Sequence, residues 1–197
     1  MKRALFLVAS LTYGFTSYAE ASEKPVRTGP RSQVGRVGHD VVRVFQNANS
    51  PAFCMGVAGG STKPRASIKQ GNCTFRGKTL LADQYWILEP VGNTIYYHIR
   101  NGKNRNMCLG VDRGSRAPRA DIRLGTCNGN ADQKWSLPSP PGKPNDDPAT
   151  VSIRNAHNLC IGVAGASTSR AQLKQNNCTG AHDQTWIMWW VGDGPVG

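Results

Sequence analysis

The sequence predicts an all-β fold in which three repeats of several short strands each close around a pseudo-threefold axis. Three recurring features indicate this: paired cysteines with similar spacing, a Gln-x-Trp motif, and short stretches in which apolar and polar residues alternate. From tryptophan to tryptophan the period is 49 and then 51 residues. A unit this small cannot bury an apolar face alone, so the three units must share one core.

Strand content follows from the stretches that open each repeat. Residues 42–47, 95–101 and 151–155 contain Val, Ile and Tyr, alternate in polarity and end at an asparagine. Such alternation with Asn and Gly punctuation is typical of short strands joined by tight turns. We therefore expect several short strands per repeat and no long helix.

Cysteine spacing predicts one disulfide inside each repeat. Six cysteines permit 15 pairings in principle, but the gaps within successive pairs are 19, 19 and 18 residues. The predicted disulfides are Cys54–Cys73, Cys108–Cys127 and Cys160–Cys178. A metal site is disfavoured, because the chain has no Cys-x-x-C sequence and its four histidines are scattered.

The first 21 residues have the order of a secretory signal peptide. A basic start at Met1-Lys2-Arg3 precedes an apolar run over 4–11 and small residues up to Ala21. The apolar run is shorter than the ~20 residues that a membrane-spanning helix needs. We therefore expect residues 1–21 to be removed, the mature protein to be secreted to an extracellular or periplasmic space, and no membrane span.

Composition divides the rest of the chain into an arm and a domain. Residues 22–38 are polar, basic and rich in glycine, and we expect a flexible arm there. Residues 39–197 should form the repeat domain, with repeats at about 41–92, 93–138 and 149–191. The Pro-rich stretch 138–148 is expected to be a surface loop.

The chain is strongly basic, with 24 Lys and Arg against 12 Asp and Glu and a formal net charge of +12. Removal of Lys2, Arg3 and Glu20 with the signal leaves 22 basic and 11 acidic residues, a net +11. This surplus fits a polyanionic partner, or it serves only to keep an exported protein soluble. The sequence leaves both interpretations open.

Three Gln-x-Trp motifs in register with three cysteine pairs resemble the ricin B-type lectin family, whose repeats carry this signature. The resemblance covers about residues 41–191. It implies a β-trefoil of twelve strands, with a possible sugar pocket and a bracing disulfide in each repeat. The motif itself is mostly structural, because a tryptophan buries a large area and a glutamine beside it can bond loop backbone. We expect the core to hold Trp86, Trp135 and Trp186.

The candidate sugar pockets depart from the family pattern in the same way in every repeat. Sugar-binding members usually have an aspartate two residues after the first cysteine, where this chain has Gly56, Gly110 and Gly162. Four residues before the second cysteine, a frequent glutamine is replaced by Lys69, Arg123 and Lys174. Two residues before it, a frequent tryptophan is replaced by Gly71, Gly125 and Asn176. The asparagine before the motif glutamine is replaced by Asp83, Asp132 and Asp183.

Two interpretations of this shared change stay open. In the first, the carboxylate has moved from the strand to the loop, so that the motif aspartates accept sugar hydroxyls while the nearby Lys or Arg donates. In the second, each acid pairs with its base, and the pocket is closed by a structural salt bridge that contributes ~0 to 1 kcal/mol.

Basic residues also recur in the strand that leads to each second cysteine. Because strand side chains alternate between faces, the sequence predicts one cationic face made of Arg65, Lys69, Arg119, Arg123, Arg170 and Lys174. The other face should pack into the core, through Ala66 and Ile68 and their counterparts. Three basic patches could bind carboxylate, sulfate or phosphate groups, or they are only solvated strand faces.

The function expected from these features is that of a secreted lectin-like module for acidic or other non-galactose glycans. The alternative is a protein-binding trefoil, such as a toxin delivery subunit or an inhibitor, with vestigial sugar pockets and a partner protein subunit. No catalytic motif or cofactor signature is present, so an enzyme is not expected, and a nucleic-acid partner is disfavoured. The candidate ligand-binding residues are Asp83, Asp132, Asp183, Gln84, Gln133, Gln184 and the six basic residues above.

Overall fold

The computed structural model describes residues 41–76, 79–140 and 149–190. These belong to one compact unit, Gly38–Gly197, while the other unit, Met1–Val37, lies outside the described residues. The signal peptide predicted at 1–21 and the basic arm predicted at 22–38 therefore also lie outside them, as does most of the Pro-rich stretch.

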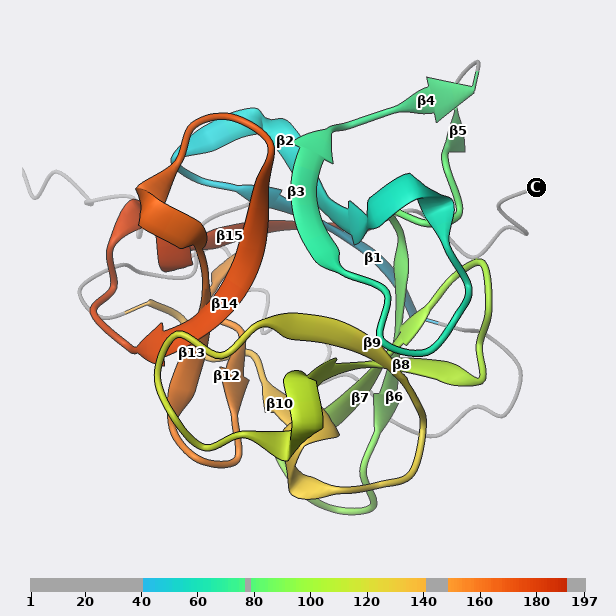
Figure 1. Ribbon diagram of the computed structural model, residues 1–197, viewed down its shortest axis with the longest axis vertical. Coiled ribbons are helices and arrows are strands. Elements are labelled where there is room, and N and C mark those ends of the chain that lie inside the picture. The colour runs from blue at the N-terminus through green and yellow to red at the C-terminus, as the bar shows by residue number, and fades with distance from the viewer. Residues whose placement is uncertain (1–40, 77–78, 141–148, 191–197) are drawn as a thin grey trace, which may run out of the picture. The chain divides into compact units, whose positions relative to one another are not determined.

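The described chain consists of short strands and single turns of 3-10 helix (Figure 1). The first repeat contains β1 (Val41–Asn47), β2 (Ser50–Val57), η1 (Ala58–Gly60), β3 (Ile68–Asn72), β4 (Phe75–Arg76), β5 (Thr79–Leu80) and β6 (Trp86–Pro90). The second contains β7 (Tyr97–Asn101), β8 (Met107–Val111), η2 (Asp112–Gly114), β9 (Ile122–Thr126), η3 (Ala131–Gln133) and β10 (Trp135–Ser136). The third contains β11 (Ala149–Val151), β12 (Arg154–Asn155), β13 (Leu159–Val163), η4 (Ala164–Ala166), β14 (Ala171–Asn177), η5 (His182–Gln184) and β15 (Trp186–Trp190).

Antiparallel pairs form a barrel, which the chain itself completes between β11 and β12. Strand β1 pairs with β6, β6 with β7, β7 with β10, β10 with β12, β11 with β15, and β15 again with β1. A hairpin from each repeat covers one end of this barrel, and the three hairpins are β2–β3, β8–β9 and β13–β14. Figure 1 shows them as three lobes around a centre where β3, β9 and β14 meet. This is a β-trefoil, as the sequence predicted.

The three motif tryptophans occupy the shared core, which confirms the predicted role. Trp86, Trp135 and Trp186 have no solvent-exposed surface. Each indole N–H donates to a carbonyl of its own repeat, that of Met55 at 3.0 Å, Leu109 at 2.8 Å and Ile161 at 3.0 Å. A buried indole needs such a partner, because an unpaired N–H in the core would be costly.

All three disulfides form within repeats, as predicted, with Cα–Cα distances of 4.9, 5.0 and 5.0 Å. Each one ties the first strand of a hairpin (β2, β8 or β13) to the residue that follows its second strand (β3, β9 or β14). Closing loops of this length stabilises the fold by about 3 kcal/mol per disulfide, because the cross-link restricts the unfolded chain.

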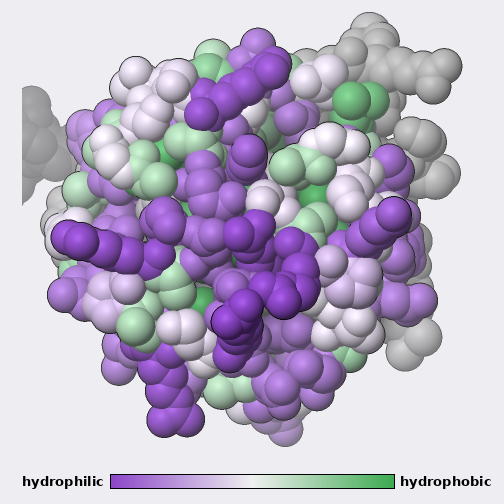
Figure 2. Space-filling model, in the orientation of Figure 1, coloured by the Kyte–Doolittle hydropathy of each residue, from purple (hydrophilic) through white to green (hydrophobic). Residues whose placement is uncertain are grey.

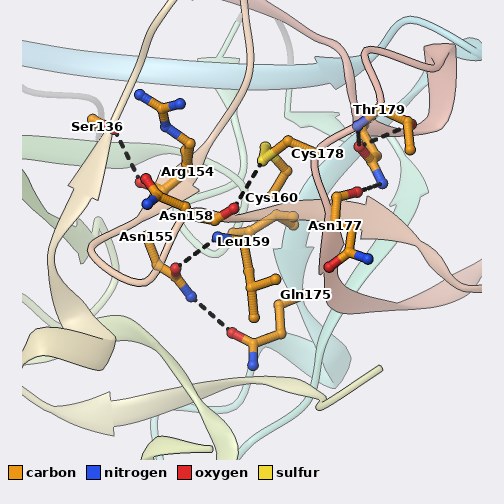
Figure 3. The surroundings of a disulfide bond; sticks show 12 residues. Ser136, Arg154, Asn155, Asn158, Leu159, Cys160, Gln175, Asn177, Cys178 and Thr179 are labelled. Atoms are coloured by element: carbon orange, nitrogen blue, oxygen red, sulfur yellow. Dashed lines mark hydrogen bonds between the residues drawn. A yellow bond between two sulfur atoms is a disulfide. The ribbon is translucent and has the colours of Figure 1, made fainter. Parts of the chain in front are cut away.

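Asparagines end strands β1, β7 and β12 and hold the turn that follows each of them. The side-chain oxygens of Asn47, Asn101 and Asn155 accept the backbone N–H two residues later, at 3.1, 3.1 and 3.0 Å. In the third repeat the Asn155 amide also donates to Gln175 at 2.8 Å, beside the Cys160–Cys178 disulfide (Figure 3). These side-chain turns explain the asparagine loops predicted from the sequence.

The first repeat carries an insertion that the other two lack. Ten positions separate Cys73 from Asp83, whereas five separate Cys127 from Asp132 and Cys178 from Asp183. The extra residues form the β4–β5 hairpin, in which Phe75 pairs with Leu80 and Arg76 with Thr79. The hairpin extends away from the barrel at the edge of the first lobe (Figure 1).

Candidate functional site

The motif glutamines hold the loop after each second cysteine. Gln84, Gln133 and Gln184 are buried. Their side-chain oxygens accept backbone N–H groups from Thr74, Asn128 and Thr179, at 2.7, 2.9 and 2.9 Å. Their amide nitrogens donate at 2.8, 2.9 and 2.9 Å to the carbonyls of Asn72, Thr126 and Asn177. Both ends of each side chain are thus engaged by the backbone, and the aspartate that precedes each glutamine is held in a fixed place.

The carboxylates of Asp132 and Asp183 lie directly over the glycines that replace the family's aspartate. A Cβ placed on Gly162 would be 3.0 Å from Asp183 Oδ2, and one placed on Gly110 would be 3.3 Å from Asp132 Oδ2. In the first repeat the Asp83 carboxylate lies near Gly60 instead of Gly56. A Cβ placed on Gly60 would be 3.8 Å from Asp83 Oδ1. The pocket carboxylate therefore comes from the loop and stands where a longer residue on the strand would reach.

The bases that the sequence placed near these acids bind a different partner. Arg123 and Lys174 both contact Asp121, each with a nitrogen–oxygen distance of 2.5 Å. Arg123 also donates to the Ser67 hydroxyl, so this ionic cluster joins all three repeats. Among the described residues, no ion pair joins Asp83, Asp132 or Asp183 to a base. The interpretation in which each motif acid is neutralised by its own base is therefore wrong for the described chain.

Burial raises the pKa of Asp183, and this effect outweighs hydrogen bonds from its own backbone N–H and that of Val163, which lower it. A raised pKa means that the folded state disfavours the charged form. The contribution of this group to stability is complete below the unfolded pKa and is lost as the pH rises through the folded pKa. The Asp183 carboxylate thus accepts backbone hydrogen bonds but has no ion-pair partner among the described residues, an arrangement that can also accept a hydrogen bond from a ligand.

Replacing Asp183 by Asn is expected to raise the melting temperature at pH 7, because the desolvated charge is removed while the side-chain oxygen stays. The difference from the unsubstituted protein should shrink as the pH falls towards 3, where the carboxyl is protonated in both states. Thermal unfolding of both proteins across this range measures it. A difference that stays constant with pH, or that grows in acid, would contradict this account.

The first repeat has a cavity of about 620 Å³ beside Asp83. Gly56, Gly60 and Gly71 form part of its wall, and Thr74 and Leu81 at the ends of the inserted hairpin form another part. Three cations line it, one from each repeat: Lys69, Lys103 and Arg170. A Cβ on Gly56 would lie 2.8 Å from Cγ of Gln84, so a residue with a side chain would clash at this part of the wall.

Lys103 was not predicted as a site residue. Its amine donates to the Gly60 carbonyl at 2.7 Å, across the boundary between the second and first repeats. The turn that places it depends on Asn101, whose side-chain oxygen accepts the Lys103 backbone N–H at 3.1 Å. Nothing in the spacing of the first repeat could have revealed this residue, because the contact exists only after two repeats pack.

The predicted cationic strand face exists only in part. Lys69, Arg123 and Lys174 lie on strands β3, β9 and β14. Arg65 and Arg119 precede their strands and have left-handed backbones, with φ of 65° and 69°, so the alternation of a strand does not extend to them. The opposite, packing face is as expected, since Ile68, Ile122 and Leu173 are completely buried.

Comparison with known proteins agrees with this architecture. Residues 33–125, 82–159 and 131–196 match the family described as ricin-type beta-trefoil lectin domain-like. The chain belongs to this family. A search of curated proteins gives no match. This ricin-type domain is similar to several solved structures, of which three are informative.

A designed 3-fold symmetric protein, ThreeFoil, superposes on the ricin-type domain with a TM-score of 0.64 at 21% identity, covering 75% of this chain and 96% of that one. An exo-beta-1,3-galactanase from Clostridium thermocellum gives 0.66 at 26% identity, covering 79% of this chain and 31% of that one. The C-half of an earthworm R-type lectin, solved with GalNAc, gives 0.57 at 11% identity, covering 76% and 98%. The chain therefore spans about a third of the galactanase.

The described residues contain neither a metal-binding cluster nor a membrane-spanning helix. No group of three or more His, Cys, Asp or Glu side chains there is arranged to hold a metal ion. The helices described are single 3-10 turns, and none is long or apolar enough to cross a membrane.

Proposed function

We propose that this chain is a secreted, non-catalytic carbohydrate-binding module whose main site is the first-repeat cavity, and that its ligand is a glycan bearing an acidic group. The observation that carries the proposal is the cavity itself. It combines the Asp83 carboxylate, which has no ion-pair partner among the described residues, with cations contributed by all three repeats. Membership of a lectin-like family supports the class of ligand.

The mixture of charges favours an acidic sugar over other anions. A carboxylate accepts hydrogen bonds from sugar hydroxyls but repels an anion that has no hydroxyl to offer. The amines of Lys69 and Lys103 and the Arg170 guanidinium bind a carboxylate or sulfate on the same ligand. A sugar carrying both groups satisfies both sides of the cavity, whereas a neutral sugar offers the cations no anionic partner.

The three repeats differ in a way that supports the first as the main site. In the second and third repeats, Arg123 and Lys174 are already bound to Asp121. Their counterpart Lys69 is exposed and lines the cavity. The open carboxylates and the cavity also argue against the alternative of vestigial pockets on a protein-binding trefoil.

Replacing Asp83 by Asn is expected to weaken binding of the preferred acidic oligosaccharide at least about tenfold, because a charged acceptor of hydroxyl groups is lost. A glycan array of neutral and acidic sugars identifies that oligosaccharide, and calorimetry then measures its affinity for each variant. Glu89→Gln is the matched control, since Glu89 binds Arg100 at 2.5 Å on the barrel and removing it deletes the same charge.

A double variant separates the role of the cations in the cavity from that of the carboxylate. Lys69→Gln with Arg170→Gln should remove the preference for acidic over neutral sugars while leaving the hydroxyl contacts. Binding that survives Asp83→Asn, or that Glu89→Gln weakens equally, would refute the first-repeat site.

A further inference from the structure

The second repeat has an arginine at a turn position where the other two repeats have glycine. Gly59, Arg113 and Gly165 each lie five residues after the first cysteine of their repeat, and their φ angles are 62°, 55° and 64°. Glycine adopts this left-handed conformation freely, whereas a residue with a Cβ adopts it at a cost of roughly 1 kcal/mol. Arg113 therefore has a strained backbone at a position where the first and third repeats have glycine.

Three more arginines lie on the adjoining loops, Arg65 where the first repeat meets the second, and Arg116 and Arg119 on the loop of the second repeat that Gln175 of the third repeat holds. Arg65 and Arg113 flank one carboxylate, with nitrogen–oxygen distances to Asp112 of 3.4 and 3.9 Å. Their side chains are 65% and 78% exposed, and the single negative charge of Asp112 cannot neutralise both. Exposed Arg116 and Arg119 follow on the same loop. We call Arg65, Arg113, Arg116 and Arg119 the arginine cluster.

The backbone beneath the cluster is firmly held. The Arg65 N–H donates to the Leu124 carbonyl at 2.6 Å, and the Arg119 N–H donates to the Gln175 carbonyl at 2.7 Å. Each of these bonds joins one repeat to the next. Figure 2 shows hydrophilic side chains gathered over the middle of the face on which β3, β9 and β14 meet. The backbone that carries Arg65 and Arg119 is thus already ordered, which limits the backbone entropy lost when a ligand binds.

The chemistry of the cluster fits oxyanions presented in series. An arginine fork bonds two oxygens of one sulfate group, and several forks on one face suit a polymer that carries repeated sulfates. The large apolar residues exposed in the described chain are Val41, Leu81, Ile95 and Trp189, which lie on other segments, so insertion into lipid is disfavoured. Residues 61–72 and 112–126 contain no aromatic side chain on which a nucleic-acid base could stack.

We propose that the arginine cluster is a second binding site that takes a sulfated polysaccharide, separate from the first-repeat cavity. No cluster residue lines that cavity. Two sites on one rigid domain would let the protein bind a sulfated polymer and an acidic sugar at the same time. The second contact would then form at a high effective concentration.

The test measures binding to immobilised heparin as a function of salt concentration. Arg113→Gly installs the residue that the other two repeats use, so it removes the charge without lowering the melting temperature. It should weaken heparin binding about threefold to fivefold, and Arg113→Gly combined with Arg116→Ala about tenfold or more. Arg154→Ala is the charge-matched control, because Arg154 lies on barrel strand β12, and it should leave the elution salt unchanged.

Further measurements distinguish a sulfated polysaccharide from nucleic acid and lipid as the ligand, and distinguish this site from the first-repeat cavity. Desulfated heparin should bind weakly, and single-stranded DNA and anionic vesicles should bind more weakly than heparin at equal salt. Asp83→Asn should weaken sugar binding in the cavity and leave heparin binding intact, whereas Arg113→Gly should weaken heparin binding and leave sugar binding in the cavity intact. Equal losses from Arg113→Gly and Arg154→Ala, or stronger binding to DNA or vesicles, would overturn the sulfated-polysaccharide site.

Discussion

Replacing Gly102 by Ala is expected to destabilise the domain by about 3 kcal/mol or to prevent folding, the largest effect expected of a single methyl group here. An added Cβ would lie 1.9 Å from Cε2 and 2.2 Å from Cδ2 of the Tyr85 ring. Tyr85 is buried, and the Gly102 N–H donates to its carbonyl at 3.0 Å, so neither backbone segment can move away easily. Chemical denaturation with urea measures the loss.

The chain supplies a rescue for this variant. At the equivalent contact the Ala48 N–H donates to the Thr185 carbonyl at 2.9 Å, so alanine fits when threonine stands opposite it. Gly102→Ala combined with Tyr85→Thr should therefore cost less than the sum of the two single substitutions. Strict additivity in this double-mutant cycle would mean that the ring contact is not the cause of the loss.

Trp135→Ala is expected to cost about 4 kcal/mol, because it leaves a large cavity in the shared core and an unpaired carbonyl at Leu109. Trp135→Phe should cost less, since the ring is partly replaced while the indole N–H bond of 2.8 Å is still lost. Urea unfolding, with far-ultraviolet circular dichroism as the signal, measures both.

Trp189 provides the comparison within the same protein. It is 44% exposed and its indole bonds Gln46 at the surface, so Trp189→Ala should cost less than about 1 kcal/mol. Similar losses at Trp135 and Trp189 would show that the motif tryptophans do not form the common core.

Much of the fold could be read from local patterns. The cysteine gaps were sufficient for the disulfides, because two cysteines that bracket one hairpin come within bonding distance whenever that hairpin forms. The tryptophans were identified as core for a similar reason, since three large apolar side chains at one period can be buried only together. The asparagine turns depend on contacts two residues apart, which the sequence displays directly.

The site was less accessible to this reasoning. Asp121 lies two residues before Arg123, in a different repeat from Lys174, and it binds both of them. One of the two interpretations drawn from the sequence paired these bases with Asp132 and Asp183, each within its own repeat. The positive φ angles of Arg65 and Arg119 were likewise invisible, because they arise where each loop docks on the next repeat.

The sequence by itself determined the trefoil, the three disulfides, the tryptophan core and the shared replacement of the pocket aspartate by glycine. These are properties of a repeat, and they recur wherever the repeat recurs. Only the tertiary structure decided which acids stay unpaired, which cations line the first-repeat cavity and where the arginines gather. The physical reason is that these charges meet across repeat boundaries. Their interaction depends strongly on distance, and packing, not position in the chain, sets those distances.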